Sequence, residues 1–154
     1  MMNKEEIITC IKCSPNKNAE VVQIKQDLRS LQEAVDGYIE YCYPFDDDNI
    51  CVLCNEEGKL IPLDFSRPVL DENNNIVDLI AGTCYIMGYT PDGWNRSLTD
   101  DEIKHYMKLW KYPIEVFKWI MAKGVFDNGF GVNSVIDIRP FDGETGRKVK
   151  AYGR

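Results

Sequence analysis

The chain has 154 residues, with 25 Asp and Glu against 18 Lys and Arg, which gives a net charge of −7. Hydrophobic residues make up 44% of it and charged residues 28%, a composition typical of one soluble globular domain. Nucleic acid and anionic membranes are not expected as partners, because binding to both depends on neutralising phosphates. No apolar run approaches the roughly 20 residues of a membrane-spanning helix, and no signal peptide pattern opens the chain. We therefore expect a cytoplasmic protein whose six cysteines are thiols or metal ligands rather than disulfides.

The first half of the chain predicts strands around one short helix. Leu28, Leu31 and Val35 recur at helical spacing, and Asp27 before them suits an N-cap, so a helix is expected over 28–35. Gly37 stands where a helix end favours positive φ. Runs rich in β-branched and aromatic residues predict strands over 6–13, 20–25 and 38–43.

Residues 50–63 predict a β-hairpin, because two apolar runs flank the polar turn Asn55-Glu56-Glu57-Gly58-Lys59. An Asn-rich turn follows at 71–75. Residues 76–80 fit either a short strand or a helical turn, and 84–88 fit a further strand.

The C-terminal part predicts two helices and a hairpin. Thr99 and Glu102 form a capping box at the start of the first helix. Pro113 and Gly124 suit the two ends of a second helix over 113–123, whose wide apolar surface indicates packing on the main sheet or a subunit interface in a homo-oligomer. The terminal hairpin is expected from residues 132–138 and 148–152.

These elements sum to an α+β fold, an antiparallel sheet with a few helices packed on one face. We expect a domain over residues 1–110. The rest, 111–154, reads as an extension of helix and hairpin that packs on the domain or forms an interface.

Four separated motifs, in this order, carry a resemblance. They are Gly37-Tyr38-Ile39-Glu40 after the helix pattern, Cys54-Asn55-Glu56-Glu57-Gly58-Lys59, Ile80-Ala81-Gly82-Thr83, and Ser97-Leu98-Thr99-Asp100. Over about residues 7–110 the chain resembles an uncharacterised family, a domain of unknown function found in phages, plasmids and other bacterial mobile elements. The resemblance implies a mobile-element context and a small cytoplasmic domain, and it implies no catalytic residue.

Two CxxC pairs, Cys10/Cys13 and Cys51/Cys54, raise the question of a zinc site, since paired CxxC motifs commonly supply four thiolates. In an extended strand, residues i and i+3 point to opposite faces, so neither pair chelates unless the chain turns sharply. Buried packing thiols are favoured, with a zinc-stabilised structural module as an alternative.

No motif for nucleophilic or phosphate-binding chemistry is present, and the lone His105 is expected to be exposed. Asp71-x-Asn73-x-Asn75 resembles the start of a calcium loop but lacks its glycine and its final glutamate, so no metal or cofactor is expected. Turn residues next to strand ends supply amide, cationic and stacking groups for an anionic ligand, although each also fits a structural role: Tyr38, Asn55, Lys59, Arg67, Thr83 and Arg96. Four strand tyrosines are expected to pack on the sheet rather than to bind: Tyr41, Tyr43, Tyr85 and Tyr89.

Two classes of function remain. The first is a non-catalytic binding protein of a phage or mobile element that interferes with host defence, either by sequestering a small signalling nucleotide or by blocking a host protein with its acidic surface. The second is a carboxylate- or metal-dependent nucleotide hydrolase that uses Asp46–Asp48 or Glu56.

Overall fold

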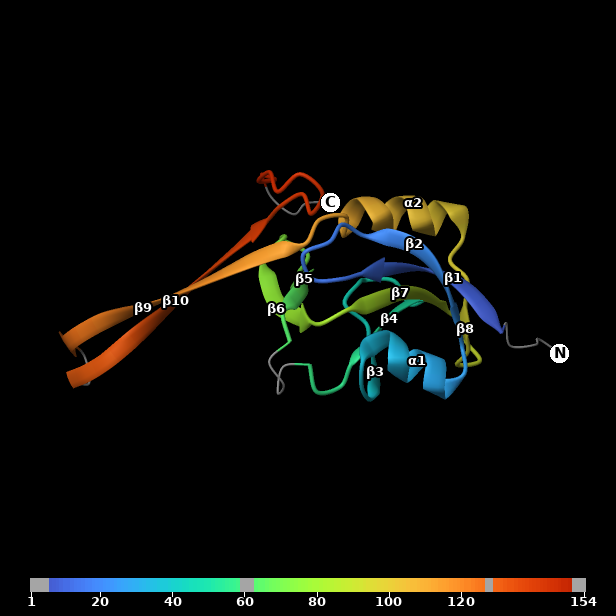
Figure 1. Cartoon of the computed structure of the whole chain (residues 1–154), viewed down its shortest axis with the longest axis horizontal. Helices are drawn as coiled ribbons and strands as arrows, with labels where there is room; N and C mark the ends of the chain where they lie inside the picture. Colours follow the sequence, from blue (N-terminus) through green and yellow to red (C-terminus); the bar gives the residue numbers. More distant parts are fainter. Residues whose placement is uncertain (1–5, 59–62, 127–128, 151–154) are drawn as a thin grey trace.

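The computed structural model describes the backbone of residues 6–58, 63–126 and 129–150, and within these ranges the side chains outside 117–137. Figure 1 shows a sheet-based body with a long two-stranded ribbon extending from one side. No helix in the described part of the chain is long and apolar enough to cross a membrane.

A five-strand antiparallel path forms the central sheet, and its strand order is not the chain order. The order is β2-β1-β7-β4-β3, and the short strand β8 pairs with β7. The predicted antiparallel sheet is confirmed. Its strands are β1 (Ile7–Cys13), β2 (Glu20–Lys25), β3 (Ile39–Cys42), β4 (Ile50–Asn55), β7 (Cys84–Tyr89) and β8 (Asn95–Arg96).

The predicted hairpin over 50–63 is wrong, because β4 is an interior strand. Its two neighbours are β3 and β7, with Cys54 opposite Glu40 and Leu53 opposite Tyr85. Both edges of β4 are therefore occupied. Residues 59–62 lie outside the described range. An apolar run predicts a strand, but it does not say which strand will pair with it.

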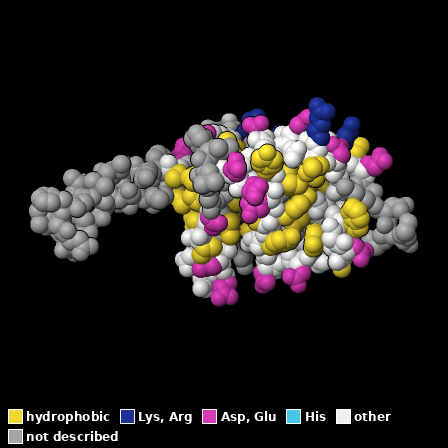
Figure 2. Space-filling view, turned by 90° about the horizontal axis from the view of Figure 1, so that it is seen from below, with side chains coloured by type: hydrophobic (Ala, Val, Ile, Leu, Met, Phe, Trp, Pro, Cys, Tyr) yellow, Lys and Arg dark blue, Asp and Glu magenta, His cyan; other side chains and the backbone are white. Residues whose placement is uncertain are grey.

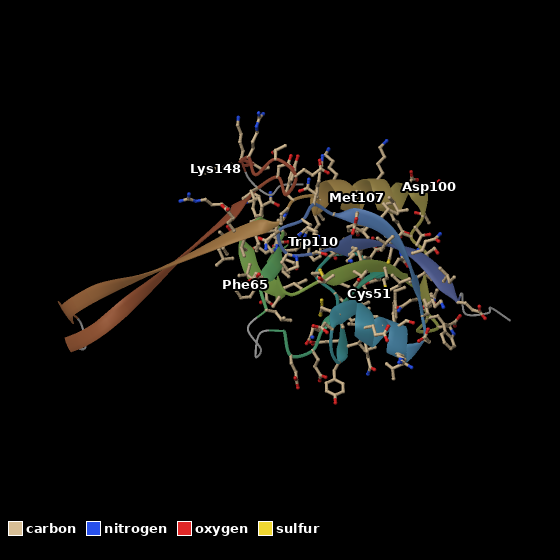
Figure 3. The ribbon with its side chains drawn as sticks, viewed as in Figure 1. Cys51, Phe65, Asp100, Met107, Trp110 and Lys148 are labelled. Atoms are coloured by element: carbon tan, nitrogen blue, oxygen red, sulfur yellow. The ribbon has the colours of Figure 1, made fainter. Side chains whose placement is uncertain are left out.

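The two helices lie on opposite faces of the sheet, so the prediction that the helices pack on one face is wrong. The helix α1 (Leu28–Val35) buries Leu31 and Val35 in a cluster with Leu53 and Met87. The helix α2 (Asp100–Leu109) buries Tyr106 against the other face, together with Trp110 just after it. Figure 3 shows Met107 and Trp110 toward the C-terminal end of α2, with Asp100 at the opposite end. Because strand side chains alternate, one sheet presents two apolar faces, and each needs its own cover.

The ends of both helices follow the sequence closely, with one correction. Asp27 caps α1 by accepting a hydrogen bond from the Ser30 amide at 2.9 Å, and Thr99 and Glu102 form the predicted capping box of α2. The residue in the left-handed region after α1 is Asp36, with φ 58°, and not Gly37. A glycine is needed at position 37 for a different reason, because an added Cβ would lie 2.6 Å from Nδ2 of Asn55.

Two further strands, β5 (Phe65–Leu70) and β6 (Ile76–Ala81), form a separate antiparallel pair. The Asn-rich turn between them is confirmed. Asp71 accepts hydrogen bonds from the amides of Asn73 and Asn75, at 2.8 and 2.9 Å, and Asn74 has positive φ. The carboxylate that resembled a calcium ligand therefore closes a turn.

The helix predicted over 113–123 is wrong. This segment lies in the strand β9 (Ile114–Phe126), which pairs along its length with β10 (Gly129–Pro140). Its apolar residues occur at intervals compatible with a helix, but they are mostly β-branched or aromatic, which favours a strand.

The predicted pairing of 132–138 with 148–152 is also wrong, since the partner of β10 is β9. Only an isolated bridge, Phe141 to Lys148, lies where that hairpin was expected, and 151–154 are outside the described residues. The base of the extension contacts the domain at the β1–β2 turn, where the Asn18 amide donates to Asp142 at 3.0 Å.

Candidate functional site

A cavity of about 270 Å³ opens on the α1 face of the sheet, beside the helix. The eight residues of α1 are too few to cover a face five strands wide, so part of this face remains open. Four aromatic side chains surround the opening, and Leu31 and Asn95 complete its wall. The aromatic residues are Tyr41, Tyr43, Tyr89 and Trp94.

Strand geometry and one tight turn bring these rings together. Tyr41 lies in β3 and packs on the α1 face, and Tyr43, which directly follows that strand, lines the same cavity. Tyr89 ends β7, and its ring meets that of Tyr43 edge to face with centroids 6.0 Å apart. The turn after β7 returns Trp94 to the same place, because the Thr90 amide donates to the Trp94 carbonyl at 2.9 Å and Gly93 has φ 86°.

A polar network forms one side of the cavity. Asn95 Nδ2 donates to the Tyr41 hydroxyl at 2.7 Å, and the Cys51 thiol donates to Asn95 Oδ1 at 3.7 Å. Gln26 Nε2 donates to the Asn95 carbonyl at 3.2 Å. Burial raises the pKa of Tyr41, and it raises the pKa of Cys51 to about 12. Both groups are therefore neutral at physiological pH.

The outer rings of the cavity remain available for contact. Tyr43 is 57% exposed and Trp94 is 44% exposed, which is unusual for aromatic side chains of this size. Their faces can stack on a planar group or pack against an apolar side chain of a partner. Residues 26–49, which supply Tyr41 and Tyr43, also carry seven carboxylates against one arginine, so this segment accounts for most of the net negative charge.

Figure 2 views the molecule from the side where α1 and β3 lie in Figure 1. Hydrophobic side chains gather across the middle of this side, Asp and Glu side chains surround them, and Lys and Arg lie along one margin. The exposed apolar residues of the α1–β3 segment are Leu28, Tyr38 and Tyr43.

The predicted ligand residues Tyr38 and Asn55 lie close to each other at the end of α1, outside this cavity. Tyr38 is exposed, and its carbonyl accepts from the Glu56 amide at 2.9 Å. Asn55 is buried and donates to the carbonyls of Val35 and Asp36, at 3.0 and 3.2 Å, so its amide ties the end of α1 to β4.

The other predicted ligand residues are placed elsewhere. Arg67 is fully buried in β5, and Thr83 is half-buried between β6 and β7. Arg96 pairs with Glu102 at 2.7 Å, and Lys59 lies outside the described residues. Among the five of these residues that the structure describes, it brings only Tyr38 and Asn55 together, and ligand binding by the six stays a prediction.

Sequence reasoning considered Tyr41, Tyr43 and Tyr89 only as packing residues, and it did not consider Trp94. The available signal was the turn Pro91-Asp92-Gly93-Trp94, which places a large ring in an otherwise polar loop.

The cysteine prediction is confirmed in its geometry. Cys10 and Cys51 belong to the apolar cluster under α1, whereas Cys13 and Cys54 belong to the cluster under α2. The two cysteines of each CxxC motif therefore lie on opposite faces of the sheet. Among the described residues, no group of three or more His, Cys, Asp and Glu side chains is arranged to hold a metal ion.

Two of the acidic and histidine residues considered for catalysis, Asp47 and His105, make contacts within the fold. The Asp47 carboxylate accepts from the Asn49 amide at 3.0 Å and from the Tyr106 hydroxyl at 2.8 Å. His105 is exposed, as predicted, and its ring lies edge to face on Tyr106.

Together these features define a small α+β domain with an open aromatic cavity on one face of an antiparallel sheet. The chain belongs to the family described as Domain of unknown function (DUF3846), which matches residues 8–111. This range confirms the uncharacterised family expected from the four motifs, and it ends before the ribbon. No curated protein and no solved structure was found to match the chain.

Proposed function

We propose that this chain is a non-catalytic binding protein of a phage or other mobile element, which acts in the bacterial cytoplasm by covering a basic surface of a host defence protein. The observation that carries the proposal is the position of the exposed Tyr43 and Trp94 next to a segment, 26–49, with a net charge of −6. Tyrosine and tryptophan are enriched among residues that dominate binding energy, and complementary charge steers association.

A second candidate ligand is a small signalling nucleotide. The cavity favours a nucleotide in one respect, since a base can stack on its tyrosine and tryptophan rings. The residues that line the cavity include no Lys or Arg, so its described wall offers phosphates no cationic partner. We therefore place the partner protein first.

The test compares binding by the wild-type protein with binding by Tyr43→Ala, Trp94→Ala and the double variant. Affinities for purified host defence proteins and for cyclic nucleotides would be measured by calorimetry. We expect each single change to weaken partner binding by about fivefold or more, since truncating a central aromatic residue costs about 1 kcal/mol or more. Binding should also weaken as salt concentration rises.

Val77→Ala supplies a matched control, because Val77 is an apolar residue, 61% exposed, on β6 outside the cavity. It should leave the affinity unchanged. Nucleotide binding that depends on Tyr43 and Trp94 would favour the second candidate. Equal loss in the cavity variants and the control, or no binding in either panel, would contradict both.

A further inference from the structure

Two cysteines on neighbouring strands, Cys42 in β3 and Cys54 in β4, lie in direct contact. In the register of the two strands Cys54 is opposite Glu40 and Cys42 is opposite Val52, so the cysteines are diagonal neighbours on one face. The two sulfur atoms are 3.9 Å apart, and the Cys54 thiol also donates to the Glu40 carbonyl at 3.6 Å.

One of these two thiols, Cys42, is also accessible to solvent. Cys42 is half-buried, whereas the other five cysteines are buried. Both Cys42 and Cys54 line a cavity of about 190 Å³ that lies between the β3–β4 pair and β6, where Asp78 and Ile80 form the opposite wall. A small reagent can therefore reach a sulfur atom that already contacts a second one.

The chain contains a natural comparison for this pair. Cys13 and Cys84 are directly opposite each other in β1 and β7, but both are fully buried. Cys84 also contacts the Ser66 hydroxyl at 3.8 Å, deep between the sheet and β5. The thiols of this second pair are close together, but neither is accessible to solvent, unlike Cys42 in the first pair.

We propose that Cys42 and Cys54 are an oxidisable dithiol whose product is a disulfide that ties the edge strand β3 to β4. The oxidant is a peroxide. It oxidises one thiol to a sulfenic acid and is reduced to water, or to an alcohol if it is an organic peroxide. The neighbouring thiol then attacks the sulfenic sulfur, the S–S bond forms, and a second water leaves. Two thiols are oxidised and one peroxide is reduced, so the electrons balance.

The reaction has a defined pH dependence. The hydrogen bond with Cys54, together with burial, raises the pKa of Cys42 above its ordinary value. The thiolate is the reactive form, so oxidation is slow near neutral pH and accelerates as the pH rises.

The experiment treats the folded protein with hydrogen peroxide at several pH values, followed by alkylation, intact mass measurement and peptide mapping. We expect the loss of two hydrogen atoms and a cross-linked peptide that joins Cys42 to Cys54. This product should form about tenfold faster than any product at Cys13 or Cys84 and should be reversed by a dithiol reductant.

Two variants make the assignment specific. Cys42→Ser should abolish the cross-link, whereas Cys10→Ser, in which a buried cysteine is changed instead, should leave it intact. Circular dichroism before treatment confirms that each variant is folded, and Cys42→Ala replaces Cys42→Ser if that variant is not. A cross-link between Cys13 and Cys84, or oxidation of Cys42 to higher acids without a disulfide, would overturn the proposal. So would six intact thiols under conditions that oxidise a control peptide.

Discussion

Arg67 shows how much one buried side chain can hold in place. Its guanidinium donates to the carbonyls of Ser14, Lys17, Ser66 and Trp110, at distances from 2.8 to 3.1 Å. These carbonyls belong to the β1–β2 turn, to β5 and to the end of α2. A planar group with five N–H donors suits this arrangement, in which segments distant in sequence meet at one charge.

The same charge affects a neighbouring thiol, Cys13. Burial raises the pKa of Cys13. Hydrogen bonding with Cys84 and the positive charge of Arg67 lower this pKa by more than burial raises it, so the net shift is downward. Arg67 therefore has a structural role and an electrostatic one.

Arg67→Leu should lower the free energy of unfolding by about 3–5 kcal/mol, because it removes a buried donor that four carbonyls share. Urea unfolding followed by circular dichroism measures the change. Arg29→Leu is the control, since Arg29 is an exposed residue of α1 paired with Glu33, and its cost should stay within about 0.5 kcal/mol. Similar costs for the two changes would contradict the role assigned to Arg67.

At the scale of one element, the start of α2 is held by a hydrogen-bond network that joins its capping box to Arg96 of β8. Arg96 donates to both carboxylate oxygens of Glu102, at 2.7 and 3.0 Å, and Glu102 accepts from the Thr99 amide at 2.9 Å. Gly88 in β7 makes room for this arginine, because an added Cβ would lie 2.5 Å from Nη1 of Arg96. The start of the helix is thereby linked to the sheet.

This network predicts a pH effect on stability. The hydrogen bond from Arg96 holds the pKa of Glu102 below its ordinary value of 4.5. A depressed pKa means that the stabilisation is complete above pH 4.5 and is lost as the pH falls through the folded-state value. Glu102→Gln, which keeps an amide that can cap, should be less stable than wild type at pH 7, and the difference should shrink below pH 4.

The measurement is the difference between the urea midpoints of the two proteins at each pH. Other carboxylates titrate in both proteins, so their effects largely cancel in this difference. A gap that stays constant from pH 7 to pH 3 would mean that the charge of Glu102 contributes nothing.

At the scale of the whole molecule, the ribbon of β9 and β10 is set apart from the body that the family match covers (Figure 1). Near its base β9 lies beside β5, and the Phe141 amide donates to the Pro113 carbonyl at 3.1 Å. A two-stranded ribbon by itself is only marginally stable in water. We therefore expect the central sheet, its two helices and the β5–β6 pair to unfold as one cooperative unit without the ribbon.

Deletion of residues 117–137, with Val116 and Ile138 joined by an Asn-Gly turn, should leave this unit folded. Val116 and Ile138 are register partners, so the shortened hairpin keeps its geometry, and a shorter loop costs little entropy to close. Thermal unfolding should show one transition within a few degrees of the wild type. Loss of the cooperative transition would show that the ribbon is required for the fold. Replacement of 71–75 by a different five-residue turn serves as the control for changing a loop.

Local chemistry was enough to predict much of this protein. Apolar runs rich in β-branched and aromatic residues identified the strands β1, β2, β3, β4 and β7, and apolar spacing with capping residues identified both helices. These signals depend on neighbours along the chain. The prediction for 113–123 was wrong because its apolar spacing fits both helix and strand. Pro113 and Gly124 favoured the helix, and the β-branched and aromatic composition that favours a strand was given too little weight.

Tertiary structure decided the pairing of β4, the placement of the helices on opposite faces, and the aromatic cavity. Tyr41 comes from β3, Tyr43 from the residue directly after it, Tyr89 from β7 and Trp94 from the turn after β7. These rings meet because only β4 lies between β3 and β7 in the sheet. The sequence by itself determined that these rings lie on strands and in a turn. Only the strand order, together with a helix too short to cover the face, left them exposed around one cavity.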